Sequence, residues 1–429
     1  MTSLPLPFLL NRAAGLISLI ILISGPWFVA DWASSGFRGD FWLACGLAML
    51  ALALFGRSLV LLSLPRRAQS DRFADLPCDT ESVTGSGGAL LQVACYGHRE
   101  APIMLLTQEW GYEHTLWIEI VRRLSAQYRV IAWDPAGIGR SSRPFDGVYS
   151  LDRLANDLQA VITAAGRRPT LLVGQGAGVM INLRWCELFP QMVGPQVKGM
   201  VAIDGAAGPL LEVVANSTFL RSVRRPLIDP LLRLSIIASP AFHLMNWASY
   251  LNGLGLLITR SLGFGQNPDR AAVDYATWLG LRQAPSVVAK GLQALIDAEA
   301  PSSLALGPLP VLAVASANNV LIKPASVKAM ADKAGMAFET VPHAGHLSLL
   351  TQPEVYADAM LRHARLAFAA PISDDRRDHR EVLGQTRRLI EAAPEPRSFE
   401  NPPTTFDDSG DAGDVFQAKV ATGLPTAFN

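Results

Sequence analysis

Two kinds of hydrophobic pattern divide this chain. Near the N-terminus the apolar positions are continuous, first over residues 13–30 and again over residues 41–56. Each run approaches the ~20 residues that a helix needs to cross the hydrocarbon core of a membrane. From residue 89 onward, short apolar runs alternate with stretches of helical period. The first pattern predicts a two-helix transmembrane hairpin over 1–67, and the second predicts an α/β domain with a parallel sheet over 89–370.

The remaining boundaries follow from changes in composition. Residues 68–88 are predicted to be a linker. The alternation stops between about 208 and 301, where a helical insert rich in leucine and isoleucine predicts a lid. Its apolar surface is explained either by packing onto the core or by contact with the bilayer or a lipid-like ligand. Residues 371–393 predict a charged helix, and the Pro-, Gly- and Asp-rich residues 394–429 predict a disordered tail. Strands are predicted at residues 90–95, 103–107, 129–133, 170–174, 198–203, 309–315 and 337–341.

The basic residues orient the hairpin. Arg12 precedes the first span. Four arginines lie at or after the end of the second span: Arg57, Arg66, Arg67 and Arg72. The connecting loop carries only Arg38. By the positive-inside rule, both termini and the main domain face the cytoplasm, as in an integral protein of the inner or plasma membrane. Arg57 is expected to extend toward the membrane interface.

Composition excludes several functional classes. The 37 basic and 37 acidic residues give a formal net charge of zero, so no global field attracts nucleic acid. The four cysteines lack the spacing of a metal site or disulfide framework, which predicts unpaired, buried thiols. The glycine-rich segment 174–179 lacks the third glycine of a dinucleotide loop. We therefore expect no metal and no cofactor.

That glycine-rich segment is the most informative motif. The strand predicted at 170–174 is followed by Gly174-Gln175-Gly176-Ala177-Gly178 and then by a helical stretch. In the pattern G-x-S-x-G, the central residue is a nucleophile held on a sharp strand-to-helix turn. Here that central residue is Gly176, which has no side chain.

Together with two other segments, this turn carries a family resemblance. Residues 134–142 (DPAGIGRSS) are similar to a D-x-x-G-x-G-x-S turn, and residues 342–346 (PHAGH) are similar to the segment that bears a catalytic histidine. Over about 89–366 the chain resembles the α/β-hydrolase fold, in the lidded branch that includes haloalkane dehalogenases, epoxide hydrolases and many esterases. The resemblance implies a mostly parallel eight-stranded sheet flanked by helices, with a helical lid.

The same resemblance assigns the catalytic positions. His346 matches the histidine base, and Gly176 stands at the nucleophile. Asn319 stands where the family has its aspartate, and Asp204, one strand earlier, is a substitute acid. An asparagine can hydrogen-bond an imidazole but cannot stabilise an imidazolium by charge.

The oxyanion element departs from the family too. Where His-Gly is usual, the chain has Gln108 and Glu109 after Thr107, and a carboxylate opposes the formation of an oxyanion. Pocket positions implied by the resemblance are Gln108, Trp110, Gln175 and Ala177.

Two hypotheses for function follow. The favoured one is a membrane-anchored pseudo-hydrolase that binds a ligand or acts as a scaffold or subunit of a membrane-associated complex. Its partners would be the lipid bilayer, a small apolar ligand under the lid, or a membrane protein. The other is an atypical non-covalent hydrolase or lyase that uses His346 with Glu109 or Asp204.

Overall fold

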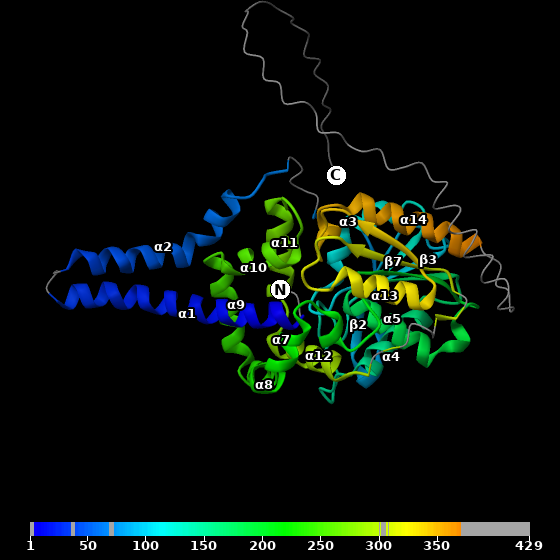
Figure 1. The fold of residues 1–429 in the computed structure, drawn as a ribbon, viewed down its shortest axis with the longest axis horizontal. Coiled ribbons are helices and arrows are strands. Elements are labelled where there is room, and N and C mark those ends of the chain that lie inside the picture. The colour runs from blue at the N-terminus through cyan, green and yellow to red at the C-terminus, as the bar shows by residue number, and fades with distance from the viewer. Residues whose placement is uncertain are drawn as a thin grey trace, which may run out of the picture.

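The central feature of the computed structural model is one eight-stranded sheet (Figure 1). The structure describes residues 4–35, 39–67, 73–299, 301, 306–307 and 309–369. Strand order is β1-β2-β4-β3-β5-β6-β7-β8, with β2 antiparallel to both of its neighbours and the others parallel. The strands are β1 Asp79–Thr84, β2 Leu90–Tyr96, β3 Ile103–Thr107, β4 Arg129–Trp133, β5 Thr170–Gln175, β6 Val197–Ile203, β7 Val311–Ser316 and β8 Ala337–Val341.

Helices cover both faces of the sheet, and each face has its own apolar core. On one face lie α4 (Leu151–Ala164), α5 (Ala177–Leu188) and α13 (Pro324–Ala334). On the other lie α3 (Ile118–Leu124) and α14 (Pro353–Ala369). Strands β3, β4 and β5 are buried along their whole length, which is why they appear in the sequence as unbroken apolar runs.

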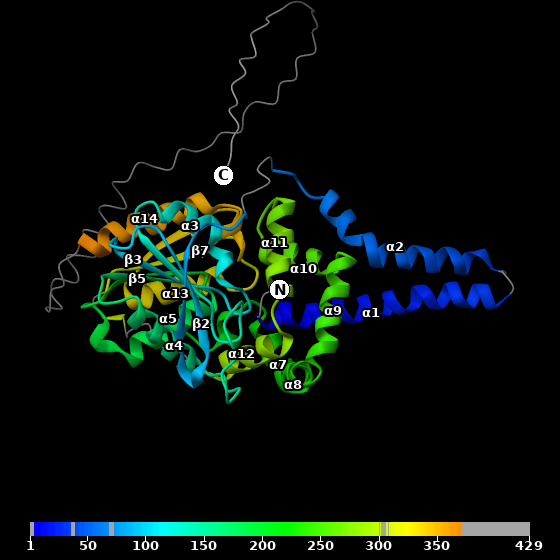
Figure 2. The same ribbon diagram turned by 180° about the vertical axis from the view of Figure 1, so that it is seen from behind.

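A helical insert separates β6 from β7 and lies on the side of the domain from which the N-terminal helices project (Figures 1 and 2). Its helices are α6 Leu210–Val213, α7 Ser217–Val223, α8 Asp229–Ile237, α9 Ser239–Leu251, α10 Leu254–Gly263, α11 Arg270–Leu281 and α12 Pro285–Asp297. The insert therefore lies where the sequence predicted a lid.

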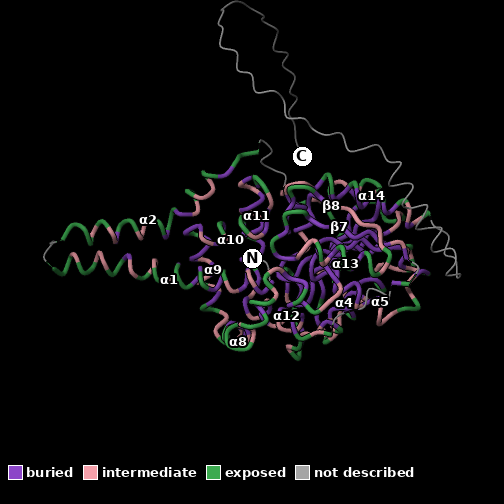
Figure 3. The backbone as a smooth tube through the Cα atoms, viewed as in Figure 1, coloured by how far each residue is buried: buried purple, intermediate pink, exposed green. Residues whose placement is uncertain are grey.

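The N-terminal helices α1 (Pro5–Ser34) and α2 (Asp40–Leu62) are each long and apolar enough to cross a membrane. They form a hairpin whose far part is mainly exposed (Figure 3). Close approach requires glycine there, since a Cβ on Gly46 would lie 2.9 Å from the Gly25 carbonyl oxygen.

The first turns of α1 belong to the globular body rather than to the projecting hairpin. Phe8 is buried in the core that α4, α5 and the insert share, and Arg12 is buried beside α9, where it donates to Asn246 at 3.3 Å. On α2, Arg57 forms a bidentate ion pair with Asp274 of α11, at 3.1 and 2.6 Å. The predicted role of Arg57 is thus corrected: its guanidinium binds a carboxylate of the insert.

Three other predictions differ from the structure. Strand β1 lies inside the predicted linker. It was not predicted as a strand because its sequence is polar and its residues are exposed at the edge of the sheet. The helix that contains the second predicted span, residues 41–56, runs from Asp40 to Leu62. Cys78 is exposed, whereas Cys95 and Cys186 are buried as expected. The predicted charged helix at 371–393 and the tail at 394–429 lie outside the described residues.

Candidate functional site

The strand-to-helix turn after β5 has the geometry expected of a nucleophile position. Gly176 joins β5 to α5 with φ 55° and ψ −115°, a conformation that is strained for residues with a Cβ. Its neighbours are held by close packing, since a Cβ on Gly178 would overlap the Thr107 carbonyl oxygen. The backbone of the turn is therefore kept in the absence of a nucleophilic side chain.

The carboxylate of Glu109 fills the space above Gly176. A Cβ built on Gly176 would overlap Oε2 of Glu109 and would lie 3.3 Å from Cε1 of His346. The same Oε2 atom accepts a hydrogen bond from the backbone N–H of Ala177 at 3.2 Å and lies 3.1 Å from Nε2 of His346. The Glu109 side chain is 1% exposed and that of His346 is 0% exposed. One oxygen atom thus occupies the nucleophile's place and uses an N–H group that would face an oxyanion.

Asn319 fixes the tautomer of His346. Its Oδ1 atom accepts from the backbone N–H groups of Leu321 (2.9 Å) and Ile322 (3.1 Å), so its NH₂ group faces Nδ1 of His346 at 3.1 Å. Nδ1 must then act as an acceptor, and the ring carries its proton on Nε2. The proton on Nε2 points at the Glu109 carboxylate.

The electrostatics of His346 agree with this arrangement at Nε2. Burial lowers the pKa of His346. The hydrogen bond with Glu109 and the charge of Glu109 raise it, and the net shift of the pKa is upward. Asn319 opposes a second proton on Nδ1, because two donors would then face each other. Both ring nitrogens are therefore engaged, and neither offers a free lone pair to a substrate.

Asp204 lies near enough for its charge to raise the pKa of His346, and it has its own hydrogen-bond partners. It follows β6 with φ 48°, and its carboxylate accepts from both the backbone N–H and the hydroxyl of Ser316. The Ser316 hydroxyl also contacts the hydroxyl of Tyr356 at 2.6 Å. Burial raises the pKa of Asp204. None of the hydrogen bonds described for its carboxylate goes to the ring of His346.

The other predicted pocket residues have structural partners. The Gln108 amide donates to the carbonyl groups of Tyr112 (3.2 Å) and Trp133 (2.9 Å), which holds the loop that carries Glu109. The Gln175 amide donates to the His346 carbonyl at 2.6 Å. The Trp110 indole donates to the carbonyl of Val288 on α12 at 3.1 Å.

The comparisons with known proteins agree with this architecture. The sequence model described as the alpha/beta hydrolase family matches residues 97–359, which is more than half of the chain. The chain belongs to the alpha/beta hydrolase family. The similar curated proteins include "Putative carbamate hydrolase RutD" of Stutzerimonas stutzeri, 22% identical over 265 residues that cover 62% of this chain and 92% of that protein.

Solved structures of family members share the fold. An esterase from Thermogutta terrifontis has a TM-score of 0.55 at 19% identity and covers 68% of this chain and 99% of its own. A membrane phospholipase A has a TM-score of 0.52 at 19% identity, covering 77% of this chain and 98% of its own. At these identities the likeness concerns the fold, and the chemistry of the site has to be argued from its own residues.

Within the described part of the chain, no group of three His, Cys, Asp or Glu side chains is placed to hold a metal ion. Sequence reasoning identified Glu109 and His346 but missed a second polar cluster on the other side of the β3–α3 loop. That cluster pairs His114 with Asp134, at 3.1 Å. Asp134 was visible as the first residue of the D-x-x-G-x-G-x-S turn, whereas the sequence around His114 carried no signal.

Proposed function

We propose that this chain is a membrane-anchored member of the alpha/beta hydrolase family that performs no covalent hydrolysis and acts as a binding or scaffold subunit at the membrane. The observation that carries the proposal is the position of Glu109 Oε2, which lies where a nucleophile side chain would project from residue 176.

Covalent acyl transfer needs a nucleophile, a free lone pair on the histidine and a free donor for the oxyanion. Gly176 supplies no nucleophile. Nε2 of His346 is engaged with Glu109, and the Ala177 N–H is bonded to the same carboxylate. Three cavities, of about 570, 340 and 20 Å³, are lined by other described residues. Neither Glu109 nor His346 is among the residues that line these three cavities.

The membrane part of the proposal rests on exposed apolar side chains. Beside the hairpin, the insert exposes Ile237 (81%), Leu244 (55%) and Leu251 (40%). Residues 217–237 and 239–251, which span helices α7 to α9, are together long and apolar enough to cross a membrane, with a bend of 102° between them. This surface fits contact with lipid beside the anchor. The orientation follows the arginine distribution and places both termini and the main domain in the cytoplasm. A membrane protein or a small apolar ligand under the insert is the further partner in this proposal.

A second candidate function uses the Glu109–His346 contact itself. A carboxylate 3.1 Å from an imidazole can exchange a proton with it, so a non-covalent hydrolase or lyase is the alternative. Asp204 is the less suitable carboxylate for that role, because its described hydrogen bonds go to Ser316 and Asn319 rather than to the ring of His346. Complete burial of Glu109 and His346 favours the binding function.

The test compares four full-length proteins in detergent: the wild type, Gly176→Ser, Glu109→Gln and Gly176→Ser/Glu109→Gly. Each is treated with a fluorophosphonate probe and with short-chain esters, and the wild type is analysed by mass spectrometry for bound small molecules. We expect no labelling and no hydrolysis by the wild type or by Gly176→Ser. We expect slow labelling of the double variant, in which Ala177 N–H and His346 Nε2 are no longer bonded to Glu109.

Glu109→Gln is the matched control for the alternative, since it keeps the size of the side chain and removes its charge. Turnover of an ester by the wild type that is abolished by Glu109→Gln would overturn the proposal in favour of acid–base catalysis. A specific bound lipid or a co-purifying membrane protein would support the binding function.

A further inference from the structure

A second polar site lies away from Gly176, in a cavity of about 340 Å³. The cavity lies between the segment at residues 75–80 that leads into β1, strand β2, the β3–α3 loop and the end of helix α11. Its volume is in the range of small-molecule sites. The polar side chains that line it are Asp75, Cys78, Thr80, Gln92, Tyr96, Glu113, His114, Thr115, Arg140 and Arg282.

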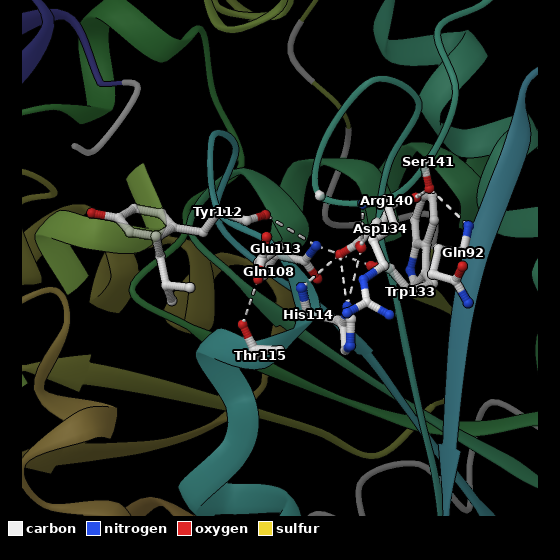
Figure 4. A network of polar contacts seen from close by, with 12 residues as sticks. Gln92, Gln108, Tyr112, Glu113, His114, Thr115, Trp133, Asp134, Arg140 and Ser141 are labelled. Carbon is white, nitrogen blue, oxygen red and sulfur yellow. Dashed lines mark hydrogen bonds and ion pairs between the residues drawn. The ribbon is translucent and has the colours of Figure 1, made fainter. Parts of the chain in front are cut away.

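His114 lines this cavity and is paired with the Asp134 carboxylate (Figure 4). The Asp134 carboxylate is fully buried and accepts from the backbone N–H of His114 at 2.6 Å and from the backbone N–H of Arg140 at 3.2 Å. Nδ1 of His114 lies 3.1 Å from each carboxylate oxygen, so Nδ1 is the donor. Nε2 is then the ring atom left for another partner, because the described hydrogen bonds of this ring are both made by Nδ1.

The environment of His114 shifts its pKa in the direction that favours the protonated ring. Burial lowers the pKa of His114, but the hydrogen bond and charge of Asp134 raise it more, and the net direction is upward. The Arg140 guanidinium lines the same cavity. The cavity thus presents one cationic side chain, Arg140, and the ring of His114, which donates from Nε2 when it is protonated.

The cavity lining also includes a carboxylate with an oxygen that has no donor. Oε1 of Glu113 accepts from the Thr115 hydroxyl and from the Arg282 guanidinium, each at 3.0 Å. Oε2 of Glu113 is buried and has no hydrogen-bond partner in the structure, and the side chain is 6% exposed. A buried carboxylate oxygen without a donor is costly, so it indicates a missing partner with an O–H or N–H group.

We infer that this cavity binds a small phosphate or carboxylate compound that also carries a hydroxyl or amino group. Its anionic oxygens accept from the Arg140 guanidinium and from Nε2 of His114 when that ring is protonated, and its O–H or N–H group donates to Glu113 Oε2. Asp75 is the other acidic side chain of the lining and is exposed on the segment before β1. The site uses none of the residues at Gly176, so it stands or falls independently of the function proposed above.

A native cysteine reports on occupancy. Cys78 lines the cavity and is exposed, whereas Cys95 and Cys186 are buried and Cys45 is half-buried in α2. The rate of maleimide labelling at Cys78 of the full-length protein in detergent is measured by mass spectrometry, with and without inorganic phosphate, glycerol 3-phosphate or L-serine. We expect at least one of these probes to slow labelling about fivefold or more at about 10 mM, well above a dissociation constant of about 1 mM.

Variants show whether the protection arises in this cavity. Glu113→Gln and Arg140→Gln are each expected to raise the half-protecting concentration about tenfold, which corresponds to about 1.4 kcal/mol. Arg140 has an exposed side chain, so its variant separates lost binding from misfolding. Arg362→Gln, which removes an exposed ion pair with Glu339 elsewhere on the domain, is expected to leave protection unchanged. Absence of protection by all three probes, or protection that survives in Glu113→Gln and Arg140→Gln alike, overturns the inference.

Discussion

The position of the Glu109 carboxylate makes a quantitative prediction for Gly176→Ala. A methyl group on residue 176 would overlap Glu109 Oε2, so the carboxylate must leave Ala177 N–H and His346 Nε2. Losing two hydrogen bonds to a charged group costs about 3 kcal/mol or more in total. The positive φ of 55° adds about 1–2 kcal/mol for any residue with a Cβ. We expect Gly176→Ala to lower the free energy of unfolding by about 4–5 kcal/mol.

A double-mutant cycle with Glu109→Ala separates these two costs. In the Glu109→Ala background the overlap is gone, and Gly176→Ala should cost only the strain of about 1–2 kcal/mol. The difference of about 3 kcal/mol corresponds to about 6–12 °C in the melting temperature of a domain of this size. Gly166→Ala is the matched control for strain alone, because Gly166 has φ 86° and no atom within 4 Å of a Cβ. Equal destabilisation by Gly176→Ala in both backgrounds would refute the placement of Glu109.

Three further predictions concern other parts of the chain. Asp274→Ala leaves the Arg57 guanidinium without its carboxylate and is expected to lower the free energy of unfolding by about 1–3 kcal/mol. The melting temperature should fall accordingly, and adding Arg57→Met should partly restore it. Burial lowers the pKa of His363 to about 4. As the pH falls from about 6.5 toward 4, this histidine is therefore protonated in the unfolded chain before it is protonated in the folded one. The free energy of unfolding should drop by up to about 3 kcal/mol over that range. A His363→Gln variant that shows the same pH dependence would contradict this assignment. In a Cys78→Ser background, a fluorophore on Ile237→Cys should be quenched by brominated lipids in nanodiscs, and one on Phe145→Cys, an exposed residue of the β4–α4 connection, should not. Equal quenching would count against contact between the insert and lipid.

Most of the sheet could be predicted from sequence because buried parallel strands leave a simple pattern. Ile103–Thr107 and Arg129–Trp133 are buried at every position, so their ranges agree with the predicted strands. Strand β1 has no such pattern, because an edge strand exposed to solvent can consist of polar residues. The partner of Arg57 was also beyond sequence reasoning, since Asp274 is 217 residues away.

The site shows the same division between pattern and geometry. The turn at Gly176 and the histidine at 346 could be predicted, because glycine spacing and the family's segments are local features. The sequence placed Glu109 near the oxyanion position but could not say whether it faced solvent. Its direction depends on the loop, which the Gln108 amide holds through carbonyl groups of Tyr112 and Trp133. The contact with Trp133 joins residues that are 25 positions apart in the sequence, so it becomes visible only in the folded chain.

The substitutions at the site are consistent with one another, because together they reverse the direction of its hydrogen bonds. In a serine hydrolase the nucleophile donates to Nε2 of the histidine, and an acid accepts from Nδ1. Here the Asn319 amide donates to Nδ1, so Nε2 must donate, and Glu109 supplies the acceptor it needs.

This reversal predicts that a serine at residue 176 would meet an N–H group at Nε2, where it needs a lone pair. Gly176→Ser/Glu109→Gly should therefore react slowly with a fluorophosphonate, and adding Asn319→Asp should accelerate labelling by about two or more powers of ten, since aspartate restores the acceptor at Nδ1. Equal labelling rates in the double and triple variants would show that Asn319 does not set the tautomer. The rate comparison thus tests whether Asn319 and Glu109 act on His346 as one unit.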